Sequence, residues 1–169
     1  MGSFSHTRTL IAELHLYVKN RETEKEKNDM ELKSNKCVMV IDEALPLGII
    51  ANTAGIMGIT LGKYIPETIG PEVVDKSGSS HLGIIQIPVP VLKADKGKLK
   101  EIRERLYQPE FECLIVVDFS DVAQSCNVYE DYIQKASAVE EKDFNYFGVG
   151  ICGEKKLVNK LTGNLPLLR

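Results

Sequence analysis

The chain of 169 residues has a length that suits one domain with one hydrophobic core. A formal net charge of −3 gives no global electrostatic case for nucleic-acid binding, and the absence of tryptophan with only 7% aromatic residues argues against a base-stacking platform. No apolar run approaches the roughly 20 residues that a membrane-spanning helix needs, so we expect no membrane partner.

The four cysteines show neither a metal-binding nor a disulfide pattern. None stands in a CxxC motif and three lie inside apolar runs, which predicts reduced thiols in the core of an intracellular protein. The N-terminal stretch LIAELHLYV lacks a small-residue cleavage site and is a poor signal peptide. We therefore expect a cytoplasmic protein without a metal or a cofactor. The cysteines are Cys37, Cys113, Cys126 and Cys152.

Residues 1–35 differ from the rest and are expected to form a flexible or helical extension of a single domain at 36–169. The run at 19–33 is almost wholly charged and polar, so it cannot bury a core. Met30 lies just before the first apolar run, which suggests that translation starts there and that the preceding segment is dispensable. A spacing of four predicts a short helix upstream, through Leu10, Leu14 and Val18.

The first predicted elements are a strand and a helix. Residues 36–41 form a continuous apolar run, which is typical of a strand buried on both faces. Dense apolar residues at 48–61 predict a mostly buried helix. Gly55 and Gly58 weaken that helix by about 1 kcal/mol each relative to alanine. We expect a close approach of the helix to the sheet to compensate.

The middle of the chain predicts a hairpin, a strand and a helix. Turn residues at 75–78 stand between short apolar runs, as in a small β-hairpin. Pro88 and Pro90 restrict their segment to a sheet edge or a bend. The sheet resumes with a strand at 89–94, and an aspartate then caps a helix over 95–107.

In the last third of the chain, predicted strands again alternate with predicted helices. Residues 113–119 and 146–152 are continuous apolar runs and predict two further core strands. One helix is expected over 120–136 and a second over 154–161, the latter stopped by Gly163. Strands that alternate with helices indicate an α/β layered fold. The stripe of the longer helix consists of Val122, Cys126, Tyr129, Ile133 and Ala136.

The tail of the chain resembles the end of type II peptidyl-tRNA hydrolases, with GVGICGEKKLVNKLTGNLPLL against a strand, a short helix and a DKVTGxLKL signature. The opening, KCVMVIDEALPLGIIANTAG, resembles that family's KxVxVxRxDLxMGKGKxAAQxxHA. The match is closer to a related family, the domain of unknown function two thousand, through this opening, the PVxVLKA segment and the Leu-Thr-Gly ending. The resemblance covers residues 36–169 and implies the hydrolase-like fold: a three-layer α/β sandwich with a mixed sheet of about four strands.

Departures from the hydrolase pattern argue against that family's activity. The hydrolases carry a lysine just after the glycine that matches Gly48, whereas this chain has Ile49. Without that cation, no group at this position holds a phosphate or a developing oxyanion. The family's aspartate is kept at Asp118, but its threonine position falls at Val122 or Ala123.

Three polar residues are candidates for a shared site, because ligands of open α/β sheets bind outside the carboxyl ends of the parallel strands. Asp42 ends the first strand, Asp118 ends a later one, and Asn52 lies in the first turn of the intervening helix. Asp118 is the candidate base and Asn52 the polarising group, with Asp42 as a ligand-binding acid. Alternatively, both acids cap helices and the asparagine bonds a loop carbonyl.

Other candidate ligand-binding residues stand alone in the sequence. Gly48 opens a helix whose free N–H groups suit an anion, although no phosphate-loop motif is present. His81 lies beside the predicted hairpin, with no second histidine or cysteine nearby to form a metal site. Lys160 and Thr162 belong to the tail signature and are equally suited to a structural role.

A basic cluster surrounds the helix at 95–107 and could track a nucleic-acid backbone. Glu101 and Glu104 interrupt it and suit ion pairs with Arg105 and Lys100, which favours a solvated helix face. The cluster consists of Lys93, Lys96, Lys98, Lys100, Arg103 and Arg105.

The leading interpretation is a protein that binds a small polar ligand at a repurposed site of a hydrolase-like fold. The second is an ester or amide hydrolase that acts on peptidyl-tRNA or a related substrate. The third is a non-catalytic interaction module that self-associates as a homo-oligomer. A nucleic-acid partner has weak support.

Overall fold

The computed structural model describes Lys19 and residues 34–169, and residues 35–169 form one compact unit. The predicted N-terminal helix and most of the polar run therefore lie outside the described residues, as does the start at Met30.

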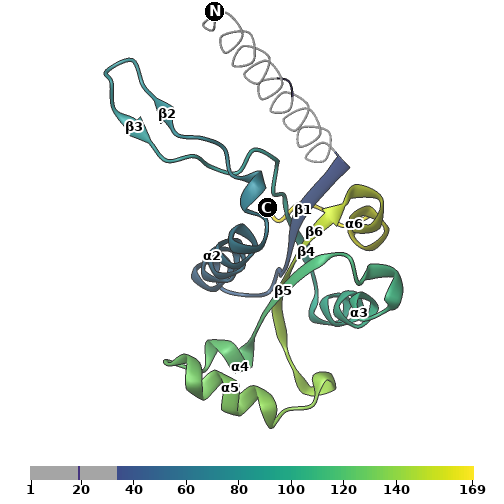
Figure 1. Ribbon diagram of the computed structural model, residues 1–169. Helices are drawn as coiled ribbons and strands as arrows, with labels where there is room; N and C mark the ends of the chain where they lie inside the picture. Colours follow the sequence, from purple (N-terminus) through teal and green to yellow (C-terminus); the bar gives the residue numbers. More distant parts are fainter. Residues whose placement is uncertain (1–18, 20–33) are drawn as a thin grey trace, which may run out of the picture. The chain divides into compact units, whose positions relative to one another are not determined.

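The core of the fold is a four-stranded mixed sheet with the strand order β4-β1-β6-β5 (Figure 1). β1 (Asn35–Asp42) pairs in parallel with β4 (Val91–Ala94) and antiparallel with β6 (Tyr146–Glu154). β6 also pairs antiparallel with β5 (Ile115–Ser120), which forms one edge. The α/β class with a mixed sheet of four strands is confirmed, and each predicted core strand is present.

Helices cover both faces of the sheet (Figure 1). α2 (Leu47–Tyr64) packs on one face, and α3 (Lys96–Leu106) with α6 (Lys155–Thr162) packs on the other. Because side chains alternate along a strand, β1 sends Met39 and Ile41 toward α2, and Val38 and Val40 toward α3 and α6. The short 3₁₀ helices are η1 (Pro66–Thr68), η2 (Pro109–Phe111) and η3 (Glu141–Asp143).

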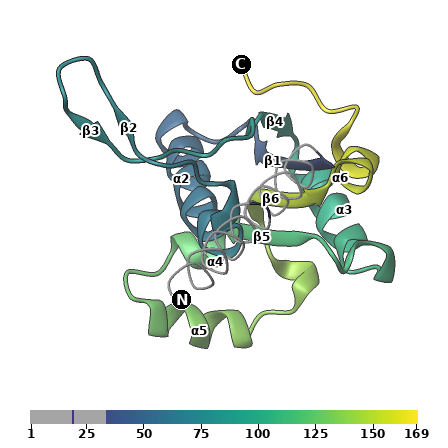
Figure 2. The same ribbon diagram turned by 45° about the horizontal axis from the view of Figure 1, so that its top comes forward.

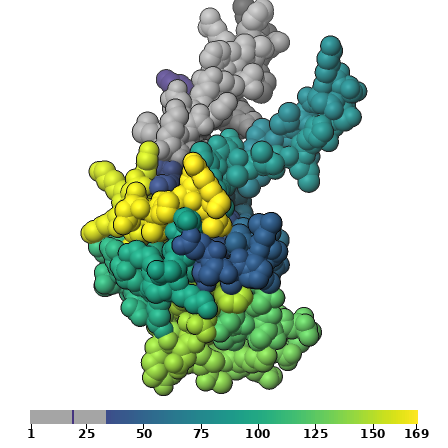
Figure 3. Space-filling view, turned by 180° about the vertical axis from the view of Figure 1, so that it is seen from behind, coloured from purple at the N-terminus to yellow at the C-terminus, as the bar shows by residue number. Residues whose placement is uncertain are grey.

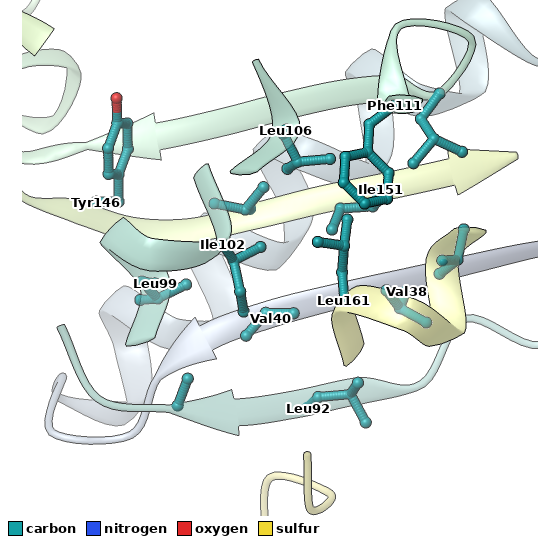
Figure 4. Close-up of a cluster of buried hydrophobic side chains, with 14 residues drawn as sticks. Val38, Val40, Leu92, Leu99, Ile102, Leu106, Phe111, Tyr146, Ile151 and Leu161 are labelled. Carbon is teal, nitrogen blue, oxygen red and sulfur yellow. The ribbon is translucent and has the colours of Figure 1, made fainter. Parts of the chain in front are cut away.

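The core beneath α3 and α6 is mainly aliphatic and includes the aromatic rings of Phe111 and Tyr146 (Figure 4). Leu99 and Ile102 of α3 are fully buried and point toward the sheet. Phe111 of η2 closes the core at the end nearest α6. Asp95 begins α3 as predicted, since its carboxylate accepts a hydrogen bond from the N–H of Lys98 at 2.7 Å.

The close approach of α2 depends on glycines of the sheet rather than on those of the helix. A Cβ at Gly148 of β6 would stand 2.8 Å from Thr53 Cγ2 and 2.9 Å from Met57 Cε. Gly150, next on the same face, would meet a leucine methyl of α2 at 3.1 Å. Gly55 of α2 has open space around it, so the expectation that its missing side chain serves packing was wrong.

The single helix predicted over 120–136 is two helices, α4 (Asp121–Gln124) and α5 (Tyr129–Ser137). The apolar stripe suggested continuity, but α5 lies beyond β5, where no strand remains for it to cover (Figure 2). Neither helix has a buried residue, and Tyr129 is 71% exposed. Without a core to hold it straight, the chain turns at 125–128.

The predicted hairpin is present as β2 (Val73–Val74) and β3 (Ser80–His81), and it projects from the domain as an arm (Figure 3). Asp75 and Gly78 make its turn, with a positive φ of 86° at the glycine, which favours this residue. Pro88 and Pro90 lie before β4 rather than inside it, as expected for a bend.

Candidate functional site

A pocket of about 420 Å³ opens at the β5 edge of the sheet, between α2, β5 and the α4–α5 segment. α2 contributes Ile56 and Thr60, β5 contributes residues 117–119, and α5 contributes Tyr129 and Tyr132. The walls are mainly apolar and aromatic, with a few residues that carry hydroxyl groups and one acidic residue. That composition is typical of small-molecule sites.

The acidic residue is Asp118, which the sequence singled out. Arg103 of α3 donates a hydrogen bond from Nε to Asp118 Oδ2 at 2.7 Å. The two side chains are only 16% and 23% exposed, so this ion pair is partly shielded from water. The guanidinium also stacks on Tyr107, with 4.1 Å between Cζ and the ring centroid. Asp118 is therefore held in place from the α3 side, two residues before the end of β5.

The negative charge of Asp118 contributes to raised pKa values at two further tyrosines. Burial raises the pKa of Tyr132, and the negative charge of Asp118 raises it further. Burial likewise raises the pKa of Tyr146 well above its usual range, with smaller effects from Tyr107 and Asp118. The Tyr146 hydroxyl donates to Glu141 Oε1 at 3.1 Å, which also favours the neutral phenol. Both phenols are thus kept in the neutral form, and Tyr146 has a hydrogen-bond acceptor in Glu141.

Tyr146 makes the stability of the fold sensitive to alkaline pH. Its folded pKa lies above the ordinary value of 10.0, so its contribution is fully present below pH 10.0 and is lost as the pH rises further. We expect wild type to lose more unfolding free energy than Tyr146→Phe between about pH 8 and about pH 11. Urea unfolding at both values measures this, and equal losses in the two proteins would refute the role of this phenol.

Asn52 lies beside the pocket, in the second turn of α2 rather than the first. Its Nδ2 donates to Gln124 Oε1 of α4 at 3.2 Å. Asn52 stands one helical turn before Ile56, on the same side of α2. The hydrogen bond therefore joins the two helices that flank the pocket.

Asp42 is not open to solvent. Its side chain ends β1 on the α3 side and is 1% exposed, and its Oδ1 accepts a hydrogen bond from the Ala44 N–H at 3.0 Å. Its Oδ2 is buried without a hydrogen-bond partner in the described part of the chain. Among the hydrogen bonds of residues 34–169, none joins two of Asp42, Asn52 and Asp118.

The other candidate residues lie apart from the pocket. Gly48 is exposed in the first turn of α2, with open space where a Cβ would stand. His81 lies on the arm, where its Nε2 is 3.2 Å from Asp75 Oδ2. Hydrogen bonds from the Ser79 N–H and from His81 lower the pKa of Asp75. The histidine thus stabilises the turn of the arm.

Lys160 and Thr162 lie at the opposite end of the sheet. They belong to α6, which follows β6, and β6 runs antiparallel to the strand that carries Asp42. Lys160 pairs with Glu110, and the buried hydroxyl of Thr162 donates to the carbonyl of Val158 at 2.8 Å. Their observed contacts are structural.

Three of the six basic residues around α3 form ion pairs with acidic side chains. Lys93 bonds Glu43 at 2.7 Å, and Lys98 bonds Glu101 at 2.9 Å instead of the expected Glu101–Arg105 pair. Together with the Arg103–Asp118 pair, these contacts place half of the cluster in local ion pairs, and Lys100 donates to the carbonyl of Lys142 instead of pairing with Glu104 as expected.

Residues 34–169 hold no group of three side chains suited to a metal ion. In the same part of the chain, no helix is both long and apolar enough to cross a membrane.

Sequence reasoning missed most of the pocket. Tyr129 and Cys126 were assigned to a core-facing stripe, and the structure places both in the pocket wall instead. The sequence did not indicate Ile56 and Thr60 as pocket residues, because they lie within a helix that is apolar around most of its circumference. The Arg103–Asp118 pair joins residues from separate elements, and local spacing cannot reveal such a contact.

Comparisons with known proteins agree with the fold. The family model described as "Protein of unknown function (DUF2000)" matches residues 35–169, which confirms that part of the resemblance. A solved structure of a protein of unknown function from Agrobacterium tumefaciens is similar with a TM-score of 0.72 at 16% identity, covering 79% of this chain and 97% of that one. No curated protein matches the chain. The chain belongs to the DUF2000 family of proteins of unknown function.

Proposed function

We propose that the protein binds a small primary amine with a flat apolar body in the pocket at the β5 edge. The observation that carries this proposal is the placement of Asp118 in the wall of an otherwise apolar and aromatic pocket. A carboxylate only accepts hydrogen bonds, so the ligand has to bring the donor.

One carboxylate oxygen of Asp118 remains able to accept a hydrogen bond from the ligand. Arg103 occupies Oδ2 of Asp118, whereas Oδ1 makes no hydrogen bond within residues 34–169. Tyr129 and Tyr132 form an edge-to-face pair with ring centroids 5.6 Å apart. Aromatic rings beside a carboxylate attract a cation, and the apolar wall from Ile56 to Phe119 suits a planar hydrocarbon. A ligand of this class places its ammonium group beside Asp118 and the tyrosines and its hydrocarbon body against the apolar wall.

The hydrolase alternative has less support. It needs Asp118 and Asn52 to act on one substrate bond, but Asp118 bonds Arg103 on the α3 side and Asn52 bonds Gln124 on the α2 side. A relation to peptidyl-tRNA hydrolases, a cytoplasmic location and self-association remain predictions.

The proposal is tested with three probes that share a phenyl ring and differ in the head group: phenethylamine, phenethyl alcohol and hydrocinnamate. Ligand-observed NMR titration should give a dissociation constant on the order of millimolar for the amine, weaker binding for the alcohol and none for the carboxylate. Asp118→Asn removes one charge-assisted hydrogen bond and should raise the dissociation constant of the amine about tenfold or more.

Two matched substitutions control for shape. Ala123→Phe fills the pocket and should abolish binding, whereas Ala51→Phe makes the same change at an exposed position of α2 outside the pocket wall. If the amine binds no better than hydrocinnamate, or if Ala123→Phe binds as well as Ala51→Phe, the proposal is wrong.

A further inference from the structure

Two buried cysteines face each other across the centre of the sheet. In the register of β1 and β6, Cys37 lies directly opposite Cys152. Both side chains are 1% exposed, and both belong to the apolar cluster beneath α2, so they point to the same face. Both are free thiols.

The pairing geometry brings these thiols within reach of a covalent bond. Side chains directly opposite in an antiparallel pair have Cβ atoms about 4.5–5.5 Å apart, and a disulfide needs about 3.5–4.5 Å. The neighbouring Cys152 thiol and burial raise the pKa of Cys37, whereas the neighbouring Cys37 thiol lowers the pKa of Cys152. Only a small inward shift of the side chains separates the dithiol from a disulfide.

We propose that Cys37 and Cys152 are an oxidation site that a low-molecular-weight disulfide converts into a cross-strand disulfide. The thiolate of one cysteine attacks one sulfur of the small disulfide, forms a mixed disulfide and releases one thiolate. The other cysteine then attacks the protein sulfur of that mixed disulfide, forms the protein disulfide and releases the second thiolate. The two protein protons end on the two released thiols, so the dithiol loses two electrons and the small disulfide gains them.

The consequence is a covalent tie between the two central strands. The link closes a loop from residue 37 to residue 152 and constrains the unfolded chain. Burial under α2 shields both sulfurs, so oxidation follows transient opening and is slower than reaction of the exposed Cys113. The other two cysteines, Cys113 and Cys126, have no register partner of this kind in the described sheet.

The test uses the full chain carrying Cys113→Ser and Cys126→Ser, so that only the paired thiols remain. The protein is incubated with oxidised glutathione in the folded state, and a second sample is refolded from urea in the same buffer. Intact mass after denaturing alkylation should show two protected thiols and no glutathione adduct, and a digest should contain the peptides of Cys37 and Cys152 linked together. The melting temperature should rise by roughly 5–15 °C and return after treatment with dithiothreitol.

Cys152→Ala in the same background is the control, and it should stop at a glutathione adduct or a free Cys37, without the rise in melting temperature. In the refolded sample, burial cannot keep oxidised glutathione from the thiols, because both sulfurs are exposed before the strands pair. If both thiols are alkylated in both samples, or if only glutathione adducts form, the proposed site does not exist.

Discussion

Gly148→Val should destabilise the domain by about 3 kcal/mol or more, because the new side chain has no space between β6 and α2. The first atom alone would stand 2.8 Å from Thr53 Cγ2 and 3.1 Å from the backbone oxygen of Val40. The backbone of β1 cannot retreat without breaking the sheet. The gain in strand propensity from glycine to valine is within about 1 kcal/mol, so the clash dominates. Urea unfolding measures the difference.

Gly55→Ala is the matched control for this prediction. Gly55 lies on the exposed side of α2 with no atom within 4 Å of an added Cβ. This variant should be more stable than wild type by about 0.5–1 kcal/mol through helix propensity alone. If Gly148→Val unfolds at the same urea concentration as Gly55→Ala, α2 does not depend on the sheet glycines for its position.

Arg103→Met should cost about 1–3 kcal/mol of unfolding free energy, the second largest effect that we expect. The change keeps most of the apolar stem but leaves the partly buried Asp118 without its cation and removes the stacking on Tyr107. Combined with Asp118→Asn in a double-mutant cycle, the two positions should show a coupling free energy above about 0.5 kcal/mol.

Lys98→Met is the comparison, because Lys98 makes a similar ion pair with Glu101 in a more exposed place. Exposed pairs contribute roughly 0–1 kcal/mol, so this variant should lie close to wild type. An Arg103→Met effect no larger than that of Lys98→Met would show that the Asp118 contact is too weak to orient the carboxylate.

The sequence predicted the layers better than the site. Continuous apolar runs such as 36–41 identified the core strands because a strand buried on both faces has no polar alternation. The Asp95 cap was predictable because its contact, with Lys98, is local.

The prediction of a single helix over 120–136 was wrong because periodic spacing identifies an apolar helix face but not the element that covers it. Here the stripe faces a pocket and solvent at the sheet edge, and the helix divides. Asp118 was a candidate from the sequence, whereas its partner Arg103 and the neighbouring tyrosines come together with it only through the fold. The spacing of residues along the sequence does not indicate such contacts between distant residues.

The central claim is that the pocket at the β5 edge is a ligand site, and protein-observed NMR tests it most directly. Wild-type protein labelled with ¹⁵N is titrated with phenethylamine, and the backbone amides are followed. We predict saturable shifts concentrated at residues 56–60, 117–119 and 129–132, which form the pocket walls. Shifts that do not saturate, or that centre on the N-terminus of α2 or on the β2–β3 arm, would contradict the account.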